Sequence, residues 1–307
     1  MGPAEPLAVV GLGSMGLATA EHLRDLGHPV YGYDPSAAAC ERAAQAGVVV
    51  LADPAEVGRA AAVVYLAVPD GEAVFAAVDG LARAGRRPLA ILDMSTLSPG
   101  AARAARDRAR ALGCRYVEVP VARAVRAART GNLLAMVACP EEELGEVRPW
   151  VERIASDVVW AGPPGSGQAL KAIHNLKILG EVALIAESVA LARAHGVPEA
   201  SLERVLRTGS SQSFMVDYQL GRMLGGDYAP GFRIVLAEKD LAIALSMADE
   251  VGLHLEVTEA ALASYARAER SGWGQMDTAA LLSYLTRAAP SDTGAQSPPS
   301  TQSPRKG

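Results

Sequence analysis

The sequence predicts an α/β protein with an N-terminal doubly wound sheet, one long helix and an all-helical C-terminal part. Three observations support this fold class. Short apolar runs alternate with helical patterns up to about residue 160. The stretch from Ala169 to Ala194 has no proline and a single glycine, and only helical patterns follow it. Alternating strands and helices are typical of a parallel sheet that is covered on both faces.

The expected strands are short runs rich in Val, Ile, Leu and Ala. They cover residues 7–10, 30–33, 48–51, 62–68, 89–92, 115–119, 133–137 and 158–160, with a short helix at 55–59. We therefore expect a dinucleotide-binding domain over residues 1–163. A helical domain for substrate and oligomer contacts should cover 164–289, with helices at 199–207, 213–224, 232–251, 256–270 and 277–287. Residues 290–307 are mostly Ser, Thr, Gln, Pro and Gly, which predicts a disordered tail.

A glycine motif follows the first expected strand and opens a helix. The order of strand, Gly-x-Gly-x-x-Gly, helix, strand and acid is that of a Rossmann-type dinucleotide fold. The glycines permit a tight turn, close approach of a pyrophosphate and close packing of helix on strand, and the helix N-terminus faces the phosphates. Asp34 should accept hydrogen bonds from the adenosine ribose and repel a 2′-phosphate, which favours NAD while NADP stays possible. The alternative is that Asp34 is only a turn residue before Pro35. The expected cofactor-binding residues here are Gly11, Leu12, Gly13, Ser14, Met15, Gly16 and Asp34.

Two later turns should line the same crevice, because turns at the carboxyl ends of parallel strands border the ligand. Val68 and Pro69 follow one strand, and Asp93-Met94-Ser95-Thr96 follows the next. Ser98 and Pro99 make a good N-cap and first helical residue. The alternative for Ser95 and Thr96 is that they serve helix entry alone.

The stretch 169–194 predicts one helix, with Ser166 as a plausible cap and Gly196 and Pro198 as stop signals. Charges interrupt every window of about 20 residues, so a membrane span is rejected. A helix apolar on nearly every side should be buried on nearly every side. Lys171, His174 and Asn175 can share one face near its start. Lys171 either reaches solvent there or handles a proton with a lowered pKa.

Composition excludes several classes of function. Charged residues make up 21% of the chain and the net charge is −5, which gives no electrostatic case for nucleic acid or an anionic membrane. The cysteines, Cys40, Cys114 and Cys139, lack metal-ligand spacing and fit thiols of a reducing cytoplasm, so we expect no metal. The first residues do not resemble a signal peptide.

With these motifs in order, residues 7–287 resemble the β-hydroxyacid dehydrogenase family, which includes 3-hydroxyisobutyrate and 6-phosphogluconate dehydrogenases. The shared motifs are Gly-Leu-Gly-x-Met-Gly at 11–16, Asp-x-Ser-Thr-x-Ser-Pro at 93–99, Gly-x-Gly-x-x-x-Lys at 165–171 and Lys-Asp-Leu at 239–241. The resemblance implies that Lys171 is the acid/base group and that Asn175 positions substrate. It also implies that Thr96 and Lys239 lie near the nicotinamide. From the residues alone, Lys239 could instead belong to a surface salt-bridge cluster with Glu238 and Asp240.

The chain departs from the family pattern at two places. Where the family has Ser-Gly-Gly in the loop that holds the substrate acid, this chain has Ala122-Arg123-Ala124. Arg123 can grip an anion with two parallel hydrogen bonds, or it can point to solvent while the loop reshapes the pocket. His174 stands where simple hydroxyacid members often carry Asn. Ser95, Ala122, Arg123, Ala124 and His174 are therefore the expected substrate contacts.

The sequence thus predicts an NAD(P)-dependent oxidoreductase that interconverts a β-hydroxy acid, or a similar small anionic alcohol, and its semialdehyde or ketone. Lys171 would take the hydroxyl proton, its pKa lowered by burial and by Lys239. We expect a cytoplasmic homodimer or homotetramer. An imine reductase shares this architecture, but that class usually lacks the lysine. The altered 122–124 loop also leaves open a cofactor-binding scaffold without catalysis.

Overall fold

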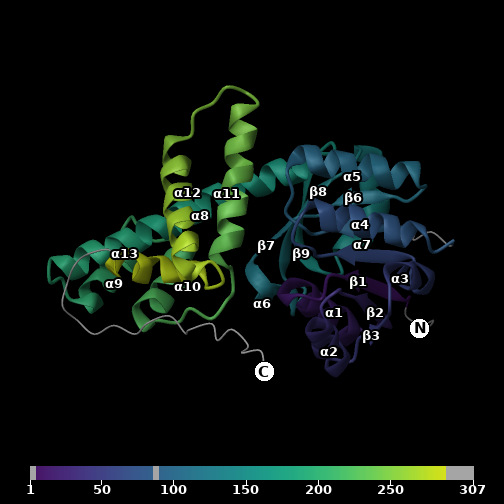
Figure 1. The fold of residues 1–307 in the computed structure, drawn as a ribbon, viewed down its shortest axis with the longest axis horizontal. Coiled ribbons are helices and arrows are strands. Elements are labelled where there is room, and N and C mark those ends of the chain that lie inside the picture. Colours follow the sequence, from purple (N-terminus) through teal and green to yellow (C-terminus); the bar gives the residue numbers. More distant parts are fainter. Residues whose placement is uncertain (1–4, 86–89, 288–307) are drawn as a thin grey trace, which may run out of the picture. The chain divides into compact units, whose positions relative to one another are not determined.

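A computed structural model describes residues 5–85 and 90–287, which fall into two compact units that divide between His174 and Asn175. The first unit contains a sheet with helices and the second is helical (Figure 1). This confirms the expected fold class. The domain boundary near Pro163 stays a prediction. Leu89, which begins the expected strand 89–92, and the tail 290–307 lie outside the described residues.

The described part of the first unit forms a nine-stranded sheet in the order β3-β2-β1-β4-β5-β6-β8-β7, with β9 also paired to β8. The strands from β3 to β6 run parallel, in the order expected of a dinucleotide-binding fold. The strands are β1 Leu7–Val10, β2 Val30–Tyr33, β3 Val49–Val50, β4 Val63–Leu66, β5 Ala90–Asp93, β6 Tyr116–Glu118, β7 Val121–Ala122, β8 Leu133–Ala138 and β9 Ala155–Gly162.

Strand β8 reverses the direction of the sheet. It pairs antiparallel with both β6 and β7, through Glu118 opposite Ala138 and Val121 opposite Ala135. The residue pairs of β6 and of β7 follow one continuous antiparallel register along β8. The two strands therefore lie along the same side of β8, with Pro120 between them. The chain from Glu118 to Ala122 is therefore held along β8 on its way out of the sheet.

Alternate residues of the strands supply two separate cores, one on each face of the sheet. Leu7 and Val9 of β1 pack in one core, and Ala8 and Val10 pack in the other. Helices α1, α2, α6 and α7 cover the first face, and α3, α4 and α5 cover the second. Side chains that alternate between two covered faces are typical of a doubly wound sheet. The helices are α1 Ser14–Asp25, α2 Ala37–Gln45, α3 Pro54–Ala60, α4 Gly71–Ala82, α5 Pro99–Ala111, α6 Ala124–Ala128 and α7 Leu144–Val151, the last preceded by the 3₁₀ turn Glu141–Glu143.

Side-chain caps begin several of these helices. Asp53, Asp70 and Ser98 each accept a hydrogen bond from the backbone N–H three residues later. Ser98 as N-cap, with Pro99 as the first helical residue, confirms the sequence-based expectation. Helix α1 differs, because its N-cap is Gly13 and no side chain caps its first N–H groups. Those donors therefore face outward at the glycine motif.

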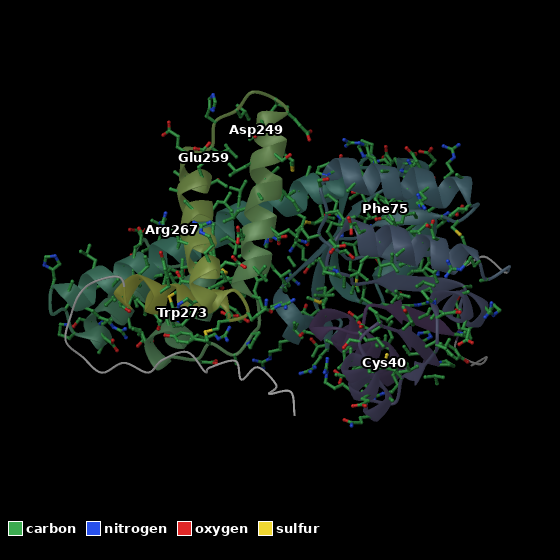
Figure 2. All side chains as sticks on the ribbon, in the orientation of Figure 1. Cys40, Phe75, Asp249, Glu259, Arg267 and Trp273 are labelled. Atoms are coloured by element: carbon green, nitrogen blue, oxygen red, sulfur yellow. The ribbon has the colours of Figure 1, made fainter. Side chains whose placement is uncertain are left out.

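The second unit is built around α8, Ser166–Ala194, which begins in the first unit and runs on into this one. Leu179, Val182 and Val189 of α8 lie in a core shared with the helices that follow. Figure 2 shows Trp273 in the turn beyond α12, where its ring meets Tyr228 edge-on. The other helices are α9 Glu199–Thr208, α10 Phe214–Gly225, α11 Ile234–Asp249, α12 Glu256–Ala268 and α13 Leu281–Arg287, with a π turn at Glu269–Trp273 and a 3₁₀ turn at Thr278–Ala280.

Two expectations about the long helix need correction. It begins at Ser166, so Ser166 is its first residue and not its cap; the earlier start uses the polar residues that precede the apolar run. The helix is also not buried on every side. Ile173, Leu184 and Leu191 are 54–63% exposed and follow one another at helical spacing along a single stripe. The stripe is open because the described helices of one chain pack on the other faces of α8.

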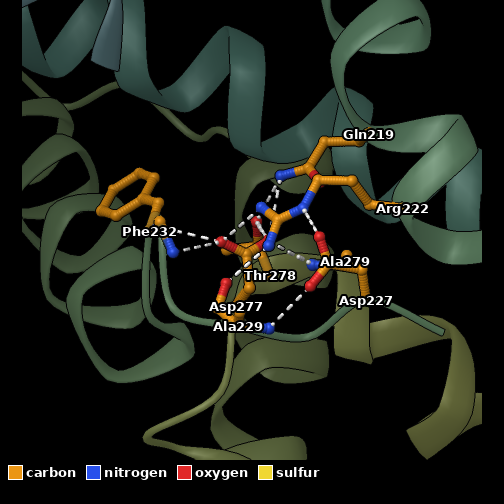
Figure 3. A network of polar contacts seen from close by, with 9 residues as sticks. Gln219, Arg222, Asp227, Ala229, Phe232, Asp277, Thr278 and Ala279 are labelled. Carbon is orange, nitrogen blue, oxygen red and sulfur yellow. Dashed lines mark hydrogen bonds and ion pairs between the residues drawn. The ribbon is translucent and has the colours of Figure 1, made fainter. Parts of the chain in front are cut away.

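One buried carboxylate organises the second unit. Asp277 accepts hydrogen bonds from the N–H groups of Gly231, Phe232 and Ala279, and it pairs with Arg222 at 2.9 Å (Figure 3). Gln219 adds a further donor. A fully buried charge is stable only with such partners. The network fixes the segment that leads into α11, the helix that carries Lys239.

Candidate active site

The glycine motif forms the turn between β1 and α1, and each glycine has a distinct reason to be there. Gly11 has a φ of +91°, and a Cβ at this position would lie 2.3 Å from the carbonyl oxygen of Ala67. A Cβ at Gly16 would collide with the carbonyl oxygen of Gly11. A Cβ at Gly13 would meet no atom of the described chain within 4 Å. Gly11 and Gly16 thus serve packing, while Gly13 leaves open the space above the uncapped α1 N-terminus that a pyrophosphate would approach.

Asp34 follows β2 and is joined to the glycine turn. Its two carboxylate oxygens accept hydrogen bonds from the backbone N–H groups of Leu12, at 2.7 Å, and Ser36, at 2.8 Å. Each oxygen has a second lone pair that a ribose hydroxyl can use. Leu12 is buried, whereas Gly13 and Ser14 are exposed and Met15 is half-buried. The turn and Asp34 together fit an adenine dinucleotide.

The turns after β4 and β5 meet at the carboxyl edge of the sheet. Ser95 Oγ accepts a hydrogen bond from the N–H of Val68 at 3.0 Å, and the N–H of Ser95 donates to Asp93 Oδ1 at 2.8 Å. Ser95 and Asp93 are buried, Thr96 is half-buried and Pro69 is exposed. The structure thus brings the expected crevice residues of the two turns together.

Lys171 lies in the second turn of α8, against the strand that leads to the substrate loop. Its Nζ donates a hydrogen bond to the carbonyl oxygen of Val121 at 2.8 Å, and the side chain is half-buried. Ala122 follows Val121 and is buried. The expected proton-transfer group therefore sits beside the expected substrate loop. His174, half-buried, lies one turn further along α8.

Arg123 and Ala124 adopt left-handed backbone conformations, with φ of +84° and +59°. These are the positions where the family has Gly-Gly, so the loop keeps a backbone that glycine adopts more easily. The Arg123 guanidinium makes an ion pair with Asp157 at 2.5 Å and a hydrogen bond to Ser156 Oγ at 3.1 Å. The side chain of Arg123 is thus held by β9 and is 39% exposed.

A separate polar group lies within the second unit. Asn175 Nδ2 donates to Asp240 Oδ2 at 2.6 Å, and both side chains are buried. Lys239 Nζ lies 3.5 Å from Asp240 Oδ1. Val235, Glu238, Ala242 and Glu269 line an open depression around Lys239. Asp240 therefore orients the amide of Asn175. The sequence predicted a role for the lysine of the Lys-Asp-Leu motif but none for its aspartate.

Sequence reasoning assigned no role to two further buried residues, Glu118 and Gln168. Glu118 accepts hydrogen bonds from the N–H groups of Gly165 and Gln168, and Gln168 binds the backbone of the Ser95–Leu97 turn. Burial raises the pKa of Glu118 to about 7, the hydrogen bonds lower it, and neighbouring Asp93 raises it. For Glu118 the usable signal was a carboxylate between apolar residues of a predicted strand; the sequence around Gln168 offers no such signal.

Neither a metal-ligand cluster nor a membrane span is found among the described residues. Among residues 5–85 and 90–287, no group of three or more His, Cys, Asp or Glu side chains is placed to hold a metal ion. Over the same ranges, the helices are too short or too polar to cross a membrane.

The chain is similar to known proteins over most of its length. Residues 6–162 match the model of the NAD-binding domain of 6-phosphogluconate dehydrogenase, and residues 165–285 match the NAD-binding model of NADP-dependent 3-hydroxyisobutyrate dehydrogenase. The chain is 28% identical to 3-sulfolactaldehyde reductase of Escherichia coli, over 91% of this chain and 95% of that one. It superposes with a TM-score of 0.83 on a 3-hydroxyisobutyrate dehydrogenase from Salmonella typhimurium, 26% identical over 91% and 99% of the two chains. A structure of Psf3 with NADP+ and 2-OPP gives a TM-score of 0.82 at 25% identity, over 91% and 99%.

The fold and the glycine turn define an NAD(P)-dependent oxidoreductase. The two matched models cover both parts of the chain, and the relatives are dehydrogenases and reductases of hydroxy acids and their aldehydes. The chain belongs to the β-hydroxyacid dehydrogenase family.

Proposed function

We propose that this enzyme interconverts a small β-hydroxy acid and its semialdehyde, with Lys171 as the proton-transfer group. The observation that carries the proposal is the position of Lys171. Its Nζ lies 2.8 Å from the Val121 carbonyl, at the start of the loop expected to hold the substrate, and Asn175 follows one turn later on α8. NAD(P), when bound, accepts or supplies the hydride.

The residues of the chain supply binding, orientation and the proton path. In oxidation, neutral Lys171 Nζ accepts the proton of the substrate hydroxyl; in reduction, the ammonium returns it. The Asn175 amide, oriented by Asp240, would hold the substrate oxygen. Ser95 and Thr96 would border the reacting carbon. The lysine also favours a hydroxyacid enzyme over an imine reductase.

The acid group of the substrate is proposed to bind at Ala122-Arg123-Ala124. Arg123 already pairs with Asp157, but both side chains are 39–50% exposed. Such a pair contributes only about 1 kcal/mol or less, so a substrate carboxylate or sulfonate can compete for the guanidinium. The left-handed backbone at Arg123 and Ala124 keeps the loop in the shape that the family's Gly-Gly would take.

For the cofactor we propose NAD in preference to NADP. One oxygen of Asp34 accepts the N–H of Leu12 in the glycine turn and the other accepts the N–H of Ser36, so a 2′-phosphate here would meet a negative charge. Psf3, a structural neighbour at 25% identity, was solved with NADP+. The kcat/KM values of this enzyme with NAD and with NADP should therefore be compared directly.

We also propose a homodimer or homotetramer that covers the exposed stripe of Ile173, Leu184 and Leu191 on α8. Large apolar side chains exposed along one side of a helix are typical of a subunit contact. Leu184→Glu should shift the assembly toward the monomer in light scattering at matched concentration. An unchanged mass would place the contact elsewhere. The cytoplasmic location stays a prediction.

The proposed reaction is tested with a panel of acids and with one variant. 3-Hydroxyisobutyrate, 2-(hydroxymethyl)glutarate and glycerate would be assayed with NAD and NADP, together with 3-sulfolactaldehyde and NADH for the reverse direction. Lys171→Ala should lose roughly 10²–10⁴-fold in turnover with cofactor binding retained. Near-normal turnover in a folded Lys171→Ala protein would remove Lys171 from the mechanism.

A further inference from the structure

A fully buried amide joins the long helix to the turn expected beside the nicotinamide. Gln168 is 0% exposed. Its Oε1 accepts a hydrogen bond from the N–H of Leu97 at 3.0 Å, and its Nε2 donates to the carbonyl of Ser95 at 2.9 Å. Both ends of the amide are thus used on one turn, and Thr96 lies between the two contacts. A buried amide with a donor and an acceptor both satisfied fixes its partner in one orientation.

The other side of the same helical turn is held from the sheet. Glu118 ends β6, and its two oxygens accept hydrogen bonds from the N–H groups of Gly165, at 2.5 Å, and Gln168, at 3.3 Å. The first N–H groups of a helix have no partner within the helix, and a carboxylate there is also favoured by the helix dipole. Glu118 therefore caps α8 from another element, although it is 47 residues away from Gly165 along the chain.

Gly167 allows this attachment to be close. A Cβ at Gly167 would lie 2.9 Å from the carbonyl oxygen of Met136 and 3.3 Å from Glu118 Oε2. Any larger residue would push α8 away from β8 and from Glu118. The Gly-Ser-Gly turn thus has a packing reason that is independent of any ligand.

We propose that Gln168 and Glu118 are positioning residues that lock the first turn of α8 to the Ser95–Leu97 turn and so set where Lys171 Nζ lies. Lys171 follows Gln168 by three residues, within one helical turn, so a tilt of that turn displaces both. Its contact with the Val121 carbonyl lies on the same β6–β7 segment that carries Glu118. The inference rests on the proposed role of Lys171 in proton transfer.

The test separates positioning from simple stability. Gln168→Met keeps the length of the side chain and removes both hydrogen bonds. Gln219→Met is the matched control, because Gln219 is equally buried and loses two hydrogen bonds, to Asp277 and Thr278, in the second unit. Hydrogen exchange of the peptide that contains Leu97 should be faster in Gln168→Met and unchanged in Gln219→Met. This readout requires no substrate.

The kinetic measurement uses the acid that is turned over fastest in the panel, with its preferred cofactor. Gln168→Met should lower kcat by roughly 10- to 100-fold, as expected for a reacting group displaced by about 1 Å, while KM for the cofactor changes less than about threefold. Gln219→Met should lower kcat far less than Gln168→Met does, because its hydrogen bonds lie in the second unit and not at the Ser95–Leu97 turn. In a Lys171→Ala background, Gln168→Met should cost less than about threefold, because both changes act on one proton transfer.

Several results would overturn the proposal. These are an unchanged kcat in Gln168→Met, unchanged exchange at Leu97, or the same fold-loss with and without Lys171. If Gln168→Met does not fold, Gln168→Asn replaces it, since the shorter amide cannot reach both Leu97 and Ser95. If kcat falls in Lys171→Ala but not in Gln168→Met, only the positioning role of Gln168 is refuted. Retained turnover in Lys171→Ala would sink the proposed function itself.

Discussion

Glu118 should make the stability of the first unit depend on pH. Its carboxyl is buried at the end of β6, opposite Asp93 on β5. Burial raises its pKa from 4.5 to about 7; hydrogen bonds from Gly165 and Gln168 and the charge of Arg103 lower it, and the charge of Asp93 raises it. A carboxyl whose pKa is higher in the folded than in the unfolded state contributes stability below about pH 4.5. That stability is lost as pH rises through 7.

The expected size follows from a pKa of about 7 in the folded state against 4.5 in the unfolded state. At 1.36 kcal/mol per unit this is about 3 kcal/mol in full, of which about 2 to 3 kcal/mol falls between pH 5 and pH 8.5. Glu118→Gln is neutral at every pH and keeps one acceptor oxygen for the start of α8. The free energy of unfolding of wild type, relative to Glu118→Gln, should therefore fall by this amount over that range.

The assay is urea unfolding followed by tryptophan fluorescence. Trp150 and Trp160 lie in the first unit and Trp273 in the second, so both proteins would carry Trp273→Phe to report the first unit alone. Glu146→Gln is the control, because that carboxyl is 64% exposed beside Arg115 and should show little pH-dependent difference. Parallel stability curves for wild type and Glu118→Gln from pH 5 to 8.5 would refute the reasoning.

Three further predictions concern single side chains. Asp277→Ala should cost about 3–5 kcal/mol of unfolding free energy, because the N–H groups of Gly231, Phe232 and Ala279 lose their acceptor and Arg222 loses its buried partner. Asp227→Ala, on the same arginine but 58% exposed, should cost about 1 kcal/mol or less; equal losses in urea unfolding would contradict the network. Asp34→Asn should narrow the preference for NAD in kcat/KM, and better use of NADP by the unmodified enzyme would contradict the role of Asp34. Arg123→Ala should weaken apparent binding of an acidic substrate by about 2–4 kcal/mol and spare its amide analogue; an equal loss on both would point to loop shape.

Local sequence patterns were sufficient for the fold class and for most strands of the first unit. Strand β1 at Leu7–Val10 and strand β2 at Val30–Tyr33 have the expected bounds, and Ser98 and Pro99 begin α5 as expected. A short apolar run buried on both faces and a capped helix start are read within a few residues, because the forces that select them act over one or two turns. The expected strand at 48–51 shortens to Val49–Val50, since it pairs only with β2.

The helices α2, α4, α6 and α7 and strand β7 were not anticipated. Much of that sequence is Ala-rich or short, so periodicity within it is weak. Strand β7, Val121–Ala122, exists because β8 supplies its hydrogen bonds, and Arg123 adopts its left-handed conformation between this strand and the start of α6. The side-chain type of Arg123 gives no indication that its φ is positive, because non-glycine residues rarely adopt this conformation.

The sequence by itself determined the fold class, the dinucleotide turn with Asp34, and Lys171 and Asn175 on one helix, because each depends on residues close together in the chain. Tertiary structure alone decided which distant groups complete those features. Glu118 reaches the start of α8, Gln168 reaches the Ser95–Leu97 turn, Asp240 reaches Asn175, and Asp157 takes the guanidinium of Arg123. These pairs are 34 to 73 residues apart, and a buried polar group accepts whatever partner the packing of the sheet and helices brings within hydrogen-bond distance.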